Sequence, residues 1–300
     1  MSIIDHPSLR TLLTTKHEGS GAGRPLAVFD CDGTLVRGDV GESMLYMQIE
    51  RFRFHVSPAD VWPDYPDRKG LDRAYRELLA TNGKDVAQHR SFDDFATRIL
   101  SWYFGRIEER RIAKACADIV KLLAGFTLGE VRALAEESFQ RELAAPPGKR
   151  ALGGRALPRG IRWLKETGEL LRSVQSAGFD ILVVSGSNRW SVEPVAAHFE
   201  IPQERVIGIA LENEDGVLSR TVRNPVPVME GKVEVLRTVD GRAPLLVVSD
   251  SRNDRALFDY SEGVKLLVNS GADSSEKYFP RQTLALDPRW VILESPTMQS

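Results

Sequence analysis

The sequence contains little cysteine: Cys31 and Cys116 are the only two among 300 residues. Their spacing matches neither a CxxC pair nor a zinc-binding motif, and two cysteines make a disulfide framework implausible. The 5 histidines show no spacing typical of metal ligands either. Carboxylates are therefore the residues to examine for catalysis or for metal binding.

An excess of charge of one sign and long apolar runs are also lacking. The 40 basic and 42 acidic residues are mixed along the chain and leave a net charge of −2. This balance lacks the footprint of a protein that binds nucleic acid or an acidic membrane. No apolar run reaches the length of a membrane span, and residues 1–20 lack the apolar core of a signal peptide. We therefore expect a cytoplasmic protein that binds neither nucleic acid nor membranes.

The residues that are present divide the chain into two patterns. From Gly160 onward, continuous apolar runs alternate with helical patterns, which predicts a parallel sheet covered by helices on both faces. In the long stretch after Val40, Val, Ile and Thr are sparse, whereas Leu, Ala and aromatic residues recur at helical spacing. Gly153-Gly154 marks a flexible point near the end of this stretch. We expect an α/β fold with a Rossmann-like core of residues 1–39 and 155–300, and a helical insert of residues 40–154 after the first strand.

Capping residues and apolar periodicity predict most individual elements. Thr127 and Glu130 have the spacing of a capping box, and Ser91 can cap the helix that follows it. Gly178 is typical of a helix end, and Asp215-Gly216 between apolar residues predicts a hairpin turn. Helices are expected over residues 5–15, 43–54, 69–80, 127–141, 161–177, 191–199 and 232–239, and strands over residues 179–184, 206–210, 244–248, 264–268 and 290–293.

The first strand carries the strongest chemical signal. An apolar run that begins at Leu26 stops at Asp30 and Asp32, which share one face if the strand pattern holds to its end. Two carboxylates so close together repel each other unless a cation or a proton lies between them. Later apolar strands end at Ser185 and Asp250. Because the carboxyl ends of parallel strands lie along one edge of the sheet, we expect these side chains to meet there.

Such a meeting fits phosphoryl transfer. Asp30 can attack an electrophile as a carboxylate nucleophile, while Asp32 protonates the leaving oxygen and later activates water. With Asp250, the carboxylates suit a hard cation such as Mg²⁺, for which a phosphate supplies further ligands. Positioning and charge neutralisation of the phosphoryl group are what this reaction needs most. Hydrogen-bond donors and positive charge for that purpose are available from Ser185, the amide of Gly186 and Lys232.

Four motifs, in this order, resemble those of the haloacid dehalogenase-like phosphohydrolases. The resemblance covers residues 26 to about 270, and the helical insert lies where that family carries a cap domain. The motifs are Asp30-Cys31-Asp32-Gly33-Thr34, Val183-Val184-Ser185-Gly186, Lys232 within Glu230-Gly231-Lys232, and Val248-Ser249-Asp250-Ser251-Arg252-Asn253-Asp254.

The resemblance implies a role for each motif residue. Asp30 is the nucleophile and Asp32 the acid/base, the second aspartate being the residue that the dehalogenase branch lacks. Mg²⁺ is bound by the Asp30 side chain, the Asp32 backbone carbonyl and Asp250. The phosphate is bound by Ser185, Gly186, Lys232 and Asn253, and the supporting residues are Gly33, Thr34 and Asp254, the last ordering either a metal-bound water or Lys232.

Plainer explanations stand beside these roles. The aspartates could be ordinary turn or cap residues, Ser185 only a helix N-cap, and Lys232 a solvated lysine in a first helical turn. Agreement of four motifs favours the catalytic interpretation.

The phosphoserine phosphatase-like branch looks nearest, and phosphocholine phosphatases are similar. The chain departs from phosphoserine phosphatases at Gly33, where they have Ser, and at Ser187-Asn188 and Ser251-Arg252. Asp39 stands where they carry a glutamate that holds the substrate amine, with Glu42 one helical turn on. Either acidic residue could bind a substrate amine or belong to a solvated face. An aromatic wall for a quaternary ammonium, or simply cap core, could be formed by Trp62, Tyr65, Trp102 and Tyr103.

The sequence therefore predicts a Mg²⁺-dependent phosphatase that acts on a small phosphorylated metabolite, phosphoserine being one candidate, through an aspartyl-phosphate intermediate. Within this class, a phosphocholine or other phosphoamine phosphatase and a phosphotransferase remain alternatives. A non-catalytic scaffold that merely accepts phosphate is a distant one. Asp32 argues against a scaffold, because such a protein needs no acid/base beside its phosphorylated aspartate.

Overall fold

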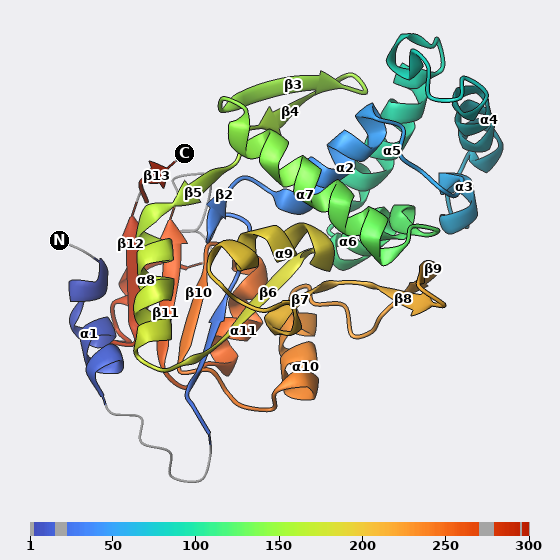
Figure 1. Cartoon of the computed structure of the whole chain (residues 1–300). Coiled ribbons are helices and arrows are strands. Elements are labelled where there is room, and N and C mark those ends of the chain that lie inside the picture. Colours follow the sequence, from blue (N-terminus) through green and yellow to red (C-terminus); the bar gives the residue numbers. More distant parts are fainter. Residues whose placement is uncertain (1–2, 16–22, 270–278, 295, 300) are drawn as a thin grey trace.

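Strand β1 (Leu26–Phe29) lies inside a six-stranded sheet in the computed structural model, which describes residues 3–15, 23–269, 279–294 and 296–299. It pairs in parallel with β10 (Leu246–Ser249) on one side and with β6 (Asp180–Asn188) on the other. The carboxyl ends of these three strands are therefore neighbours, and the predicted fold class is confirmed (Figure 1). The strand order is β12-β11-β10-β1-β6-β7, completed by β7 (Val206–Ile209), β11 (Val264–Asn269) and β12 (Trp290–Glu294).

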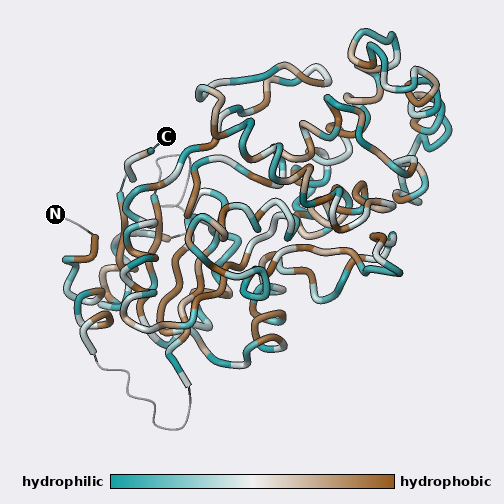
Figure 2. The backbone as a smooth tube through the Cα atoms, in the orientation of Figure 1, coloured by the Kyte–Doolittle hydropathy of each residue, from teal (hydrophilic) through white to brown (hydrophobic). Residues whose placement is uncertain are grey.

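Each face of β1 packs into its own apolar cluster, which is why the strand is apolar throughout. Ala27 and Phe29 join the cluster beneath α1 (Pro7–Thr14), α8 (Lys165–Ser176) and α9 (Arg189–His198). Leu26 and Val28 join the cluster beneath α10 (Glu230–Val239) and α11 (Arg255–Tyr260). Figure 2 shows the apolar strands enclosed between the two helical layers. A strand buried on both faces reads as a continuous apolar run rather than as an alternating one.

The helical insert forms a cap with its own apolar core at one end of the molecule (Figure 1). The predicted capping box is confirmed: Glu130 N donates to Thr127 Oγ1 at 3.2 Å, and Thr127 N donates to Glu130 Oε2 at 2.9 Å. No helix among the described residues is long and apolar enough to span a bilayer. The cap helices are α2 (Val40–Glu50), α3 (Pro58–Val61), α4 (Arg68–Leu79), α5 (Phe92–Glu108), α6 (Ile112–Val120) and α7 (Leu128–Ala144).

Some elements differ from the sequence-based expectation. Ser91 occupies the N-cap position of α5, but its hydroxyl donates to Glu77 instead of closing the helix end. Strand β6 continues to Asn188, past its expected end at residue 184, because Ser185 to Ser187 stay extended. The helix expected from residue 161 begins at Lys165, since the preceding residues form β5 (Arg162–Leu164). Strand β5 pairs with β2 (Val36–Arg37) and β13 (Met298–Gln299).

A β-hairpin that the sequence pattern did not predict connects the cap to the core. It consists of β3 (Gly148–Leu152) and β4 (Arg155–Arg159), and Gly153-Gly154 forms its turn. Gly153 has φ +53°, and a Cβ there would lie 2.8 Å from the backbone of Ala96 in α5. The glycine pair thus forms a tight turn packed on the cap. The expected domain boundary between residues 154 and 155 therefore falls inside the β3–β4 hairpin.

A second hairpin, β8 (Leu211–Glu214) and β9 (Val217–Val222), extends from the core beneath the cap, and its turn at Asp215-Gly216 confirms the prediction. Gly125 N donates to Leu218 O and Leu218 N donates to Phe126 O, both at 2.8 Å. The Leu218 side chain belongs to the apolar core of the cap. The cap is therefore bonded to this hairpin through backbone and side chain alike.

The Leu218→Ala substitution should lower the free energy of unfolding by about 2–5 kcal/mol, because it leaves a cavity where hairpin and cap meet. Leu218 is 2% exposed, whereas its neighbour Val217 is 39% exposed. Val217→Ala is thus a matched control that should cost less than about 1 kcal/mol. Urea unfolding midpoints measure both effects. Equal shifts for the two variants would contradict a stabilising contact between the β8–β9 hairpin and the cap.

Candidate active site

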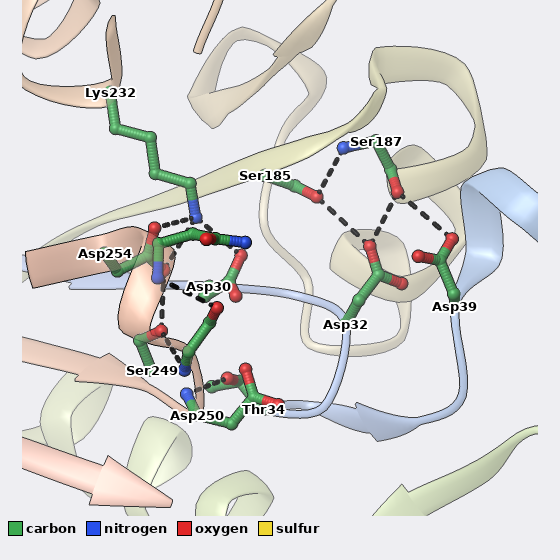
Figure 3. A network of polar contacts seen from close by, with 12 residues as sticks. Asp30, Asp32, Thr34, Asp39, Ser185, Ser187, Lys232, Ser249, Asp250 and Asp254 are labelled. Carbon is green, nitrogen blue, oxygen red and sulfur yellow. Dashed lines mark hydrogen bonds and ion pairs between the residues drawn. The ribbon is translucent and has the colours of Figure 1, made fainter. Parts of the chain in front are cut away.

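Asp30 follows β1 directly and lies in a buried ionic cluster. Its backbone N donates to Val248 O at 2.9 Å, which continues the pairing of β1 with β10. Lys232, in the first turn of α10, places Nζ 2.9 Å from Asp30 Oδ1 and 2.8 Å from Asp254 Oδ2 (Figure 3). All three side chains are buried. Lys232 is therefore no solvated first-turn lysine, and Asp254 contacts it as one of its two expected roles requires.

The charges in this cluster oppose one another. Burial raises the pKa of Asp30 well above its ordinary value, the Lys232 ammonium lowers it, and the neighbouring Asp254 and Asp250 charges raise it again. Burial also lowers the pKa of Lys232, but Asp254 and Asp30 outweigh that effect and the net shift is upward. The lysine thus stays charged beside Asp30 and offsets part of the cost of ionising it.

Asp32 lies in a different environment, formed by hydroxyl and amide donors. Its Oδ1 accepts a hydrogen bond from Val40 N, at the start of α2, at 2.7 Å. Its Oδ2 accepts from Ser187 Oγ at 2.6 Å and from Ser185 Oγ at 3.3 Å. Burial raises the pKa of Asp32, and these hydrogen bonds reduce the rise without cancelling it. Two aspartates on one strand end thus have separate partners (Figure 3).

Asp250 is set against the turn that follows β1. Its backbone N donates to Thr34 Oγ1 at 3.1 Å. Gly33 has φ +72°, which favours glycine, and a Cβ at Gly33 would lie 2.0 Å from Asp250 Oδ2, so any larger residue would require this carboxylate to move. Burial raises the pKa of Asp250 to about 7, and the Asp254 charge contributes to the rise.

The acidic side chains fit a magnesium site of the predicted kind. Among the described residues, no three His, Cys, Asp or Glu side chains converge to form a metal cage. The predicted set needs only the carboxylates of Asp30 and Asp250 with the backbone carbonyl of Asp32, and Mg²⁺ commonly takes one or two carboxylates together with waters and phosphate oxygens. No side chain in the described ranges makes an ion pair with Asp250, whose negative charge also raises the pKa of Asp30. Asp250, which is left without a cation among these residues, together with Asp30 offers hard oxygen donors that suit a divalent cation.

The remaining predicted phosphate ligands lie at the same edge of the sheet. Ser185 is fully buried, accepts a hydrogen bond from Ser187 N at 3.0 Å, and does not cap α9, whose N-cap is Asn188. Gly186 and Asn253 line the cavity in front of Asp30 and Asp32.

Two serines contribute to the site although sequence reasoning did not single them out. Ser187 Oγ donates to Asp32, as described above, and Ser249 Oγ donates to Asp254 Oδ2 at 2.6 Å. Ser187 follows Ser185 by one strand repeat, so a strand continued past residue 184 would have revealed it. Ser249 precedes Asp250 directly at the end of a buried strand, and its hydroxyl there needs a partner.

The two acidic residues considered for substrate binding both line the cavity and are half-buried. Asp39 is the N-cap of α2, and its Oδ1 accepts from Glu42 N at 2.7 Å. Glu42 accepts hydrogen bonds from the hydroxyls of Tyr46, at 2.5 Å, and Tyr103, at 3.0 Å. Burial raises the pKa of both carboxyls. They are held in place rather than spread over a solvated face.

The four aromatic residues do not form one wall of the cavity. Tyr65 and Trp102 rings lie 5.0 Å apart, Trp62 is fully buried beside them, and Arg106 lies 3.8 Å above Trp102. This group is core of the cap with its own internal cation. Only Tyr103 of the four lines the cavity.

The cavity has a volume of about 820 Å³ and lies between cap and sheet edge. Its roof includes the partly exposed side chains of Ile107, Ile112 and Ile119 from α5 and α6, together with Cys116. Burial raises the pKa of the Cys116 thiol to about 12, so it is not a thiolate nucleophile near neutral pH. The roof of the cavity is thus largely apolar, whereas its floor is polar.

This chain belongs to the haloacid dehalogenase-like hydrolase family, whose model matches residues 27–259. No curated protein matches it in sequence.

Two solved structures of unknown function share the fold. One, from Anaerococcus prevotii DSM 20548, has a TM-score of 0.70 at 20% identity, and covers 96% of this chain and 88% of its own. The other, from Bordetella pertussis Tohama I, has a TM-score of 0.52 at 18% identity, with coverages of 91% and 99%. A phosphoserine phosphatase captured as a phospho-aspartyl intermediate analogue has a TM-score of 0.43 at 15% identity, with coverages of 91% and 93%, which is too distant to bear on substrate.

The affinity for Mg²⁺ should depend on pH through Asp250. Because folding raises its pKa from 3.8 to about 7, its stabilising contribution is present at low pH and is lost as the pH rises to about 7 in metal-free protein. Mg²⁺ relieves that loss, so it should raise Tm little near about pH 5 and strongly near about pH 8. Thermal unfolding with Mg²⁺ or EDTA measures this difference. Asp250→Asn should abolish it, Asp215→Asn in the exposed hairpin turn should preserve it, and a pH-independent rise in Tm would contradict the assignment.

Proposed function

We propose that this hydrolase is a Mg²⁺-dependent phosphatase that acts on a small phosphomonoester through an aspartyl-phosphate intermediate. The observation that carries the proposal is the separation of environments between Asp30 and Asp32. Asp30 contacts a buried ammonium, whereas Asp32, among the described residues, accepts hydrogen bonds from hydroxyl and amide donors only. Titratable groups in contrasting environments commonly divide the acid and base roles of a reaction.

The reaction would proceed in two displacements. In the first, a carboxylate oxygen of Asp30 forms a bond to phosphorus while the ester P–O bond breaks, and protonated Asp32 gives its proton to the leaving oxygen. In the second, Asp32 removes a proton from water, the water oxygen attacks phosphorus, and Asp30 is released. Lys232 holds Asp30 in position throughout. Mg²⁺ bound by Asp30, Asp250 and the Asp32 carbonyl would supply charge neutralisation for the phosphoryl oxygens.

A phosphotransferase differs only in the acceptor of the second step and remains an alternative. Two features argue against a scaffold that stores phosphate on an aspartate. They are the hydrogen bond that Ser187 donates to Asp32 and the large cavity that Asp32 lines. A small phosphorylated metabolite as the substrate and a cytoplasmic location stay predictions.

Asp30→Asn should abolish phosphate release from p-nitrophenyl phosphate, because the amide is no nucleophile. Asp32→Asn should lower kcat by about 10²–10⁴-fold on alkyl phosphates, which need a proton for the leaving oxygen, and less on p-nitrophenyl phosphate. Malachite-green detection of phosphate measures both. Asp215→Asn should retain wild-type rates, and turnover by Asp30→Asn or an equal loss on both substrates would refute the assigned roles.

An amine-bearing substrate is supported by Glu42, which lines the cavity and forms no ion pair with a described cation. If it binds an ammonium group, Glu42→Gln should raise KM for phosphoserine and phosphoethanolamine by about tenfold or more, and KM for propyl phosphate much less. Because Gln can still accept from Tyr103, folding should be preserved, which near-UV circular dichroism checks. Equal changes in KM would assign Glu42 a structural role.

A further inference from the structure

The exposed side of the cavity carries a group of three arginines that the reaction described above does not use. Arg37 of β2, Arg159 at the end of β4 and Arg162 of β5 all line the same cavity as Asp30 and Lys232. We call them the arginine rim. Arg37 and Arg159 are exposed, whereas the roof and the catalytic floor of the cavity are partly or wholly buried.

Two members of the rim face each other at close range. Arg37 lies directly opposite Arg162 in the antiparallel pairing of β2 with β5. The adjacent pair, Val36 and Trp163, is buried in the core, so both arginines lie on the other face. Side chains directly opposite across antiparallel strands have Cβ atoms about 4.5–5.5 Å apart, and like charges there are unfavourable. A negatively charged group bound between the two guanidinium groups would reduce this repulsion.

The protein compensates Arg162 through backbone carbonyls but, over the residues described, offers no carboxylate to the rim. Arg162 donates to the carbonyls of Leu143, at 3.1 Å, and Ala145, at 2.7 Å, at the end of α7. Among the described residues, the Arg37 guanidinium donates to Met298 Sδ, at 3.6 Å, and to no carboxylate. In the described ranges, no carboxylate forms an ion pair with any arginine of the rim, whereas the buried Arg150 nearby pairs with both Glu142 and Glu50.

A carboxylate of α7 that contacts the backbone next to the rim is already engaged. Glu142 in α7 accepts from Gly160 N at 2.8 Å, beside the rim, but its charge pairs with the buried Arg150. Glu50 pairs in turn with Arg141 at 2.6 Å and with Arg150 at 3.5 Å. Arg37 and Arg159 therefore keep their positive charge at the cavity without a carboxylate partner in the described ranges.

We propose that the arginine rim binds a second anionic group of the substrate, so that the substrate class is a phosphomonoester with a further phosphate or carboxylate at its far end. This inference rests on the proposed function, which places the reacting phosphate at Asp30. Guanidinium groups suit both anions, because they offer paired donors to carboxylate and phosphate oxygens. The apolar roof formed by Ile107, Ile112 and Ile119 would cover an uncharged segment between the two ends.

Non-hydrolysable ligands test the rim without requiring turnover. Calorimetry in excess Mg²⁺ would compare alkylphosphonates with α,ω-alkane bisphosphonates of the same chain length, over a series of lengths. In the wild type, the second phosphonate should tighten binding by about tenfold or more at the best length. The measured quantity is the ratio of the binding constant of a bisphosphonate to that of the alkylphosphonate of equal length. In the double variant Arg37→Gln/Arg159→Gln, this ratio should fall toward one. Arg162 is kept, because it also holds the end of α7.

Lys149→Gln is the matched control: it removes an exposed cation from the same hairpin, outside the cavity, and should leave the ratio unchanged. A ratio near one in the wild type at every length, no change in the double variant, or an equal fall in Lys149→Gln would each overturn the inference. Replacing the far phosphonate by a carboxylate identifies which anion the rim prefers.

Phosphate-release assays separate the two proposals. Turnover of alkyl phosphates with a bisphosphonate ratio near one would refute the rim and keep the phosphatase. A high ratio that depends on Arg37 and Arg159, without turnover of any phosphomonoester, would refute the phosphatase and keep the anion site.

Discussion

The contact of Lys232 with Asp30 and Asp254 is the interaction on which the site depends. An ammonium and two carboxylates are removed from water together, and each makes the burial of the others tolerable. Loss of one partner from such a cluster leaves an uncompensated buried charge, which costs about 3–5 kcal/mol. The same contact joins α10 to the end of β1 and to the segment after β10. The positioning of Asp30 and the cohesion of the core therefore depend on the same contact.

Much of this arrangement could be predicted from the sequence, because buried parallel strands are apolar runs and polar residues mark their ends. Asp30, Asp32, Ser185 and Asp250 were found in this way, and the sheet edge brings them together. The β5 ladder could not be predicted, since Trp163 pairs with Val36 and Leu164 with Met298, residues far away in the chain. Such pairing is decided by tertiary contacts rather than by local pattern.

The cavity shows a similar division between local and long-range information. Motif spacing identifies its floor, because the reaction demands particular residue types at strand ends. Its roof and rim are assembled from α5, α6, the β3–β4 hairpin and β5, whose residues carry no motif. The placement of Tyr103 against Glu42, and of Trp62 in the cap core, depends on how the cap helices pack. The reaction class can therefore be predicted from short motifs, whereas the choice of substrate depends on residues that only the folded chain brings together.

The contact between the β8–β9 hairpin and the cap limits how the cap could change during evolution. The apolar core of the cap includes Trp190 from α9, Ile209 from β7 and Leu218 from β9, all of which belong to the catalytic core. An insert that shares its interior with its host is not an exchangeable module. A cap grafted from a relative would expose these side chains, so new specificities in this lineage are expected to arise by substitutions at the cavity surface rather than by exchange of the cap.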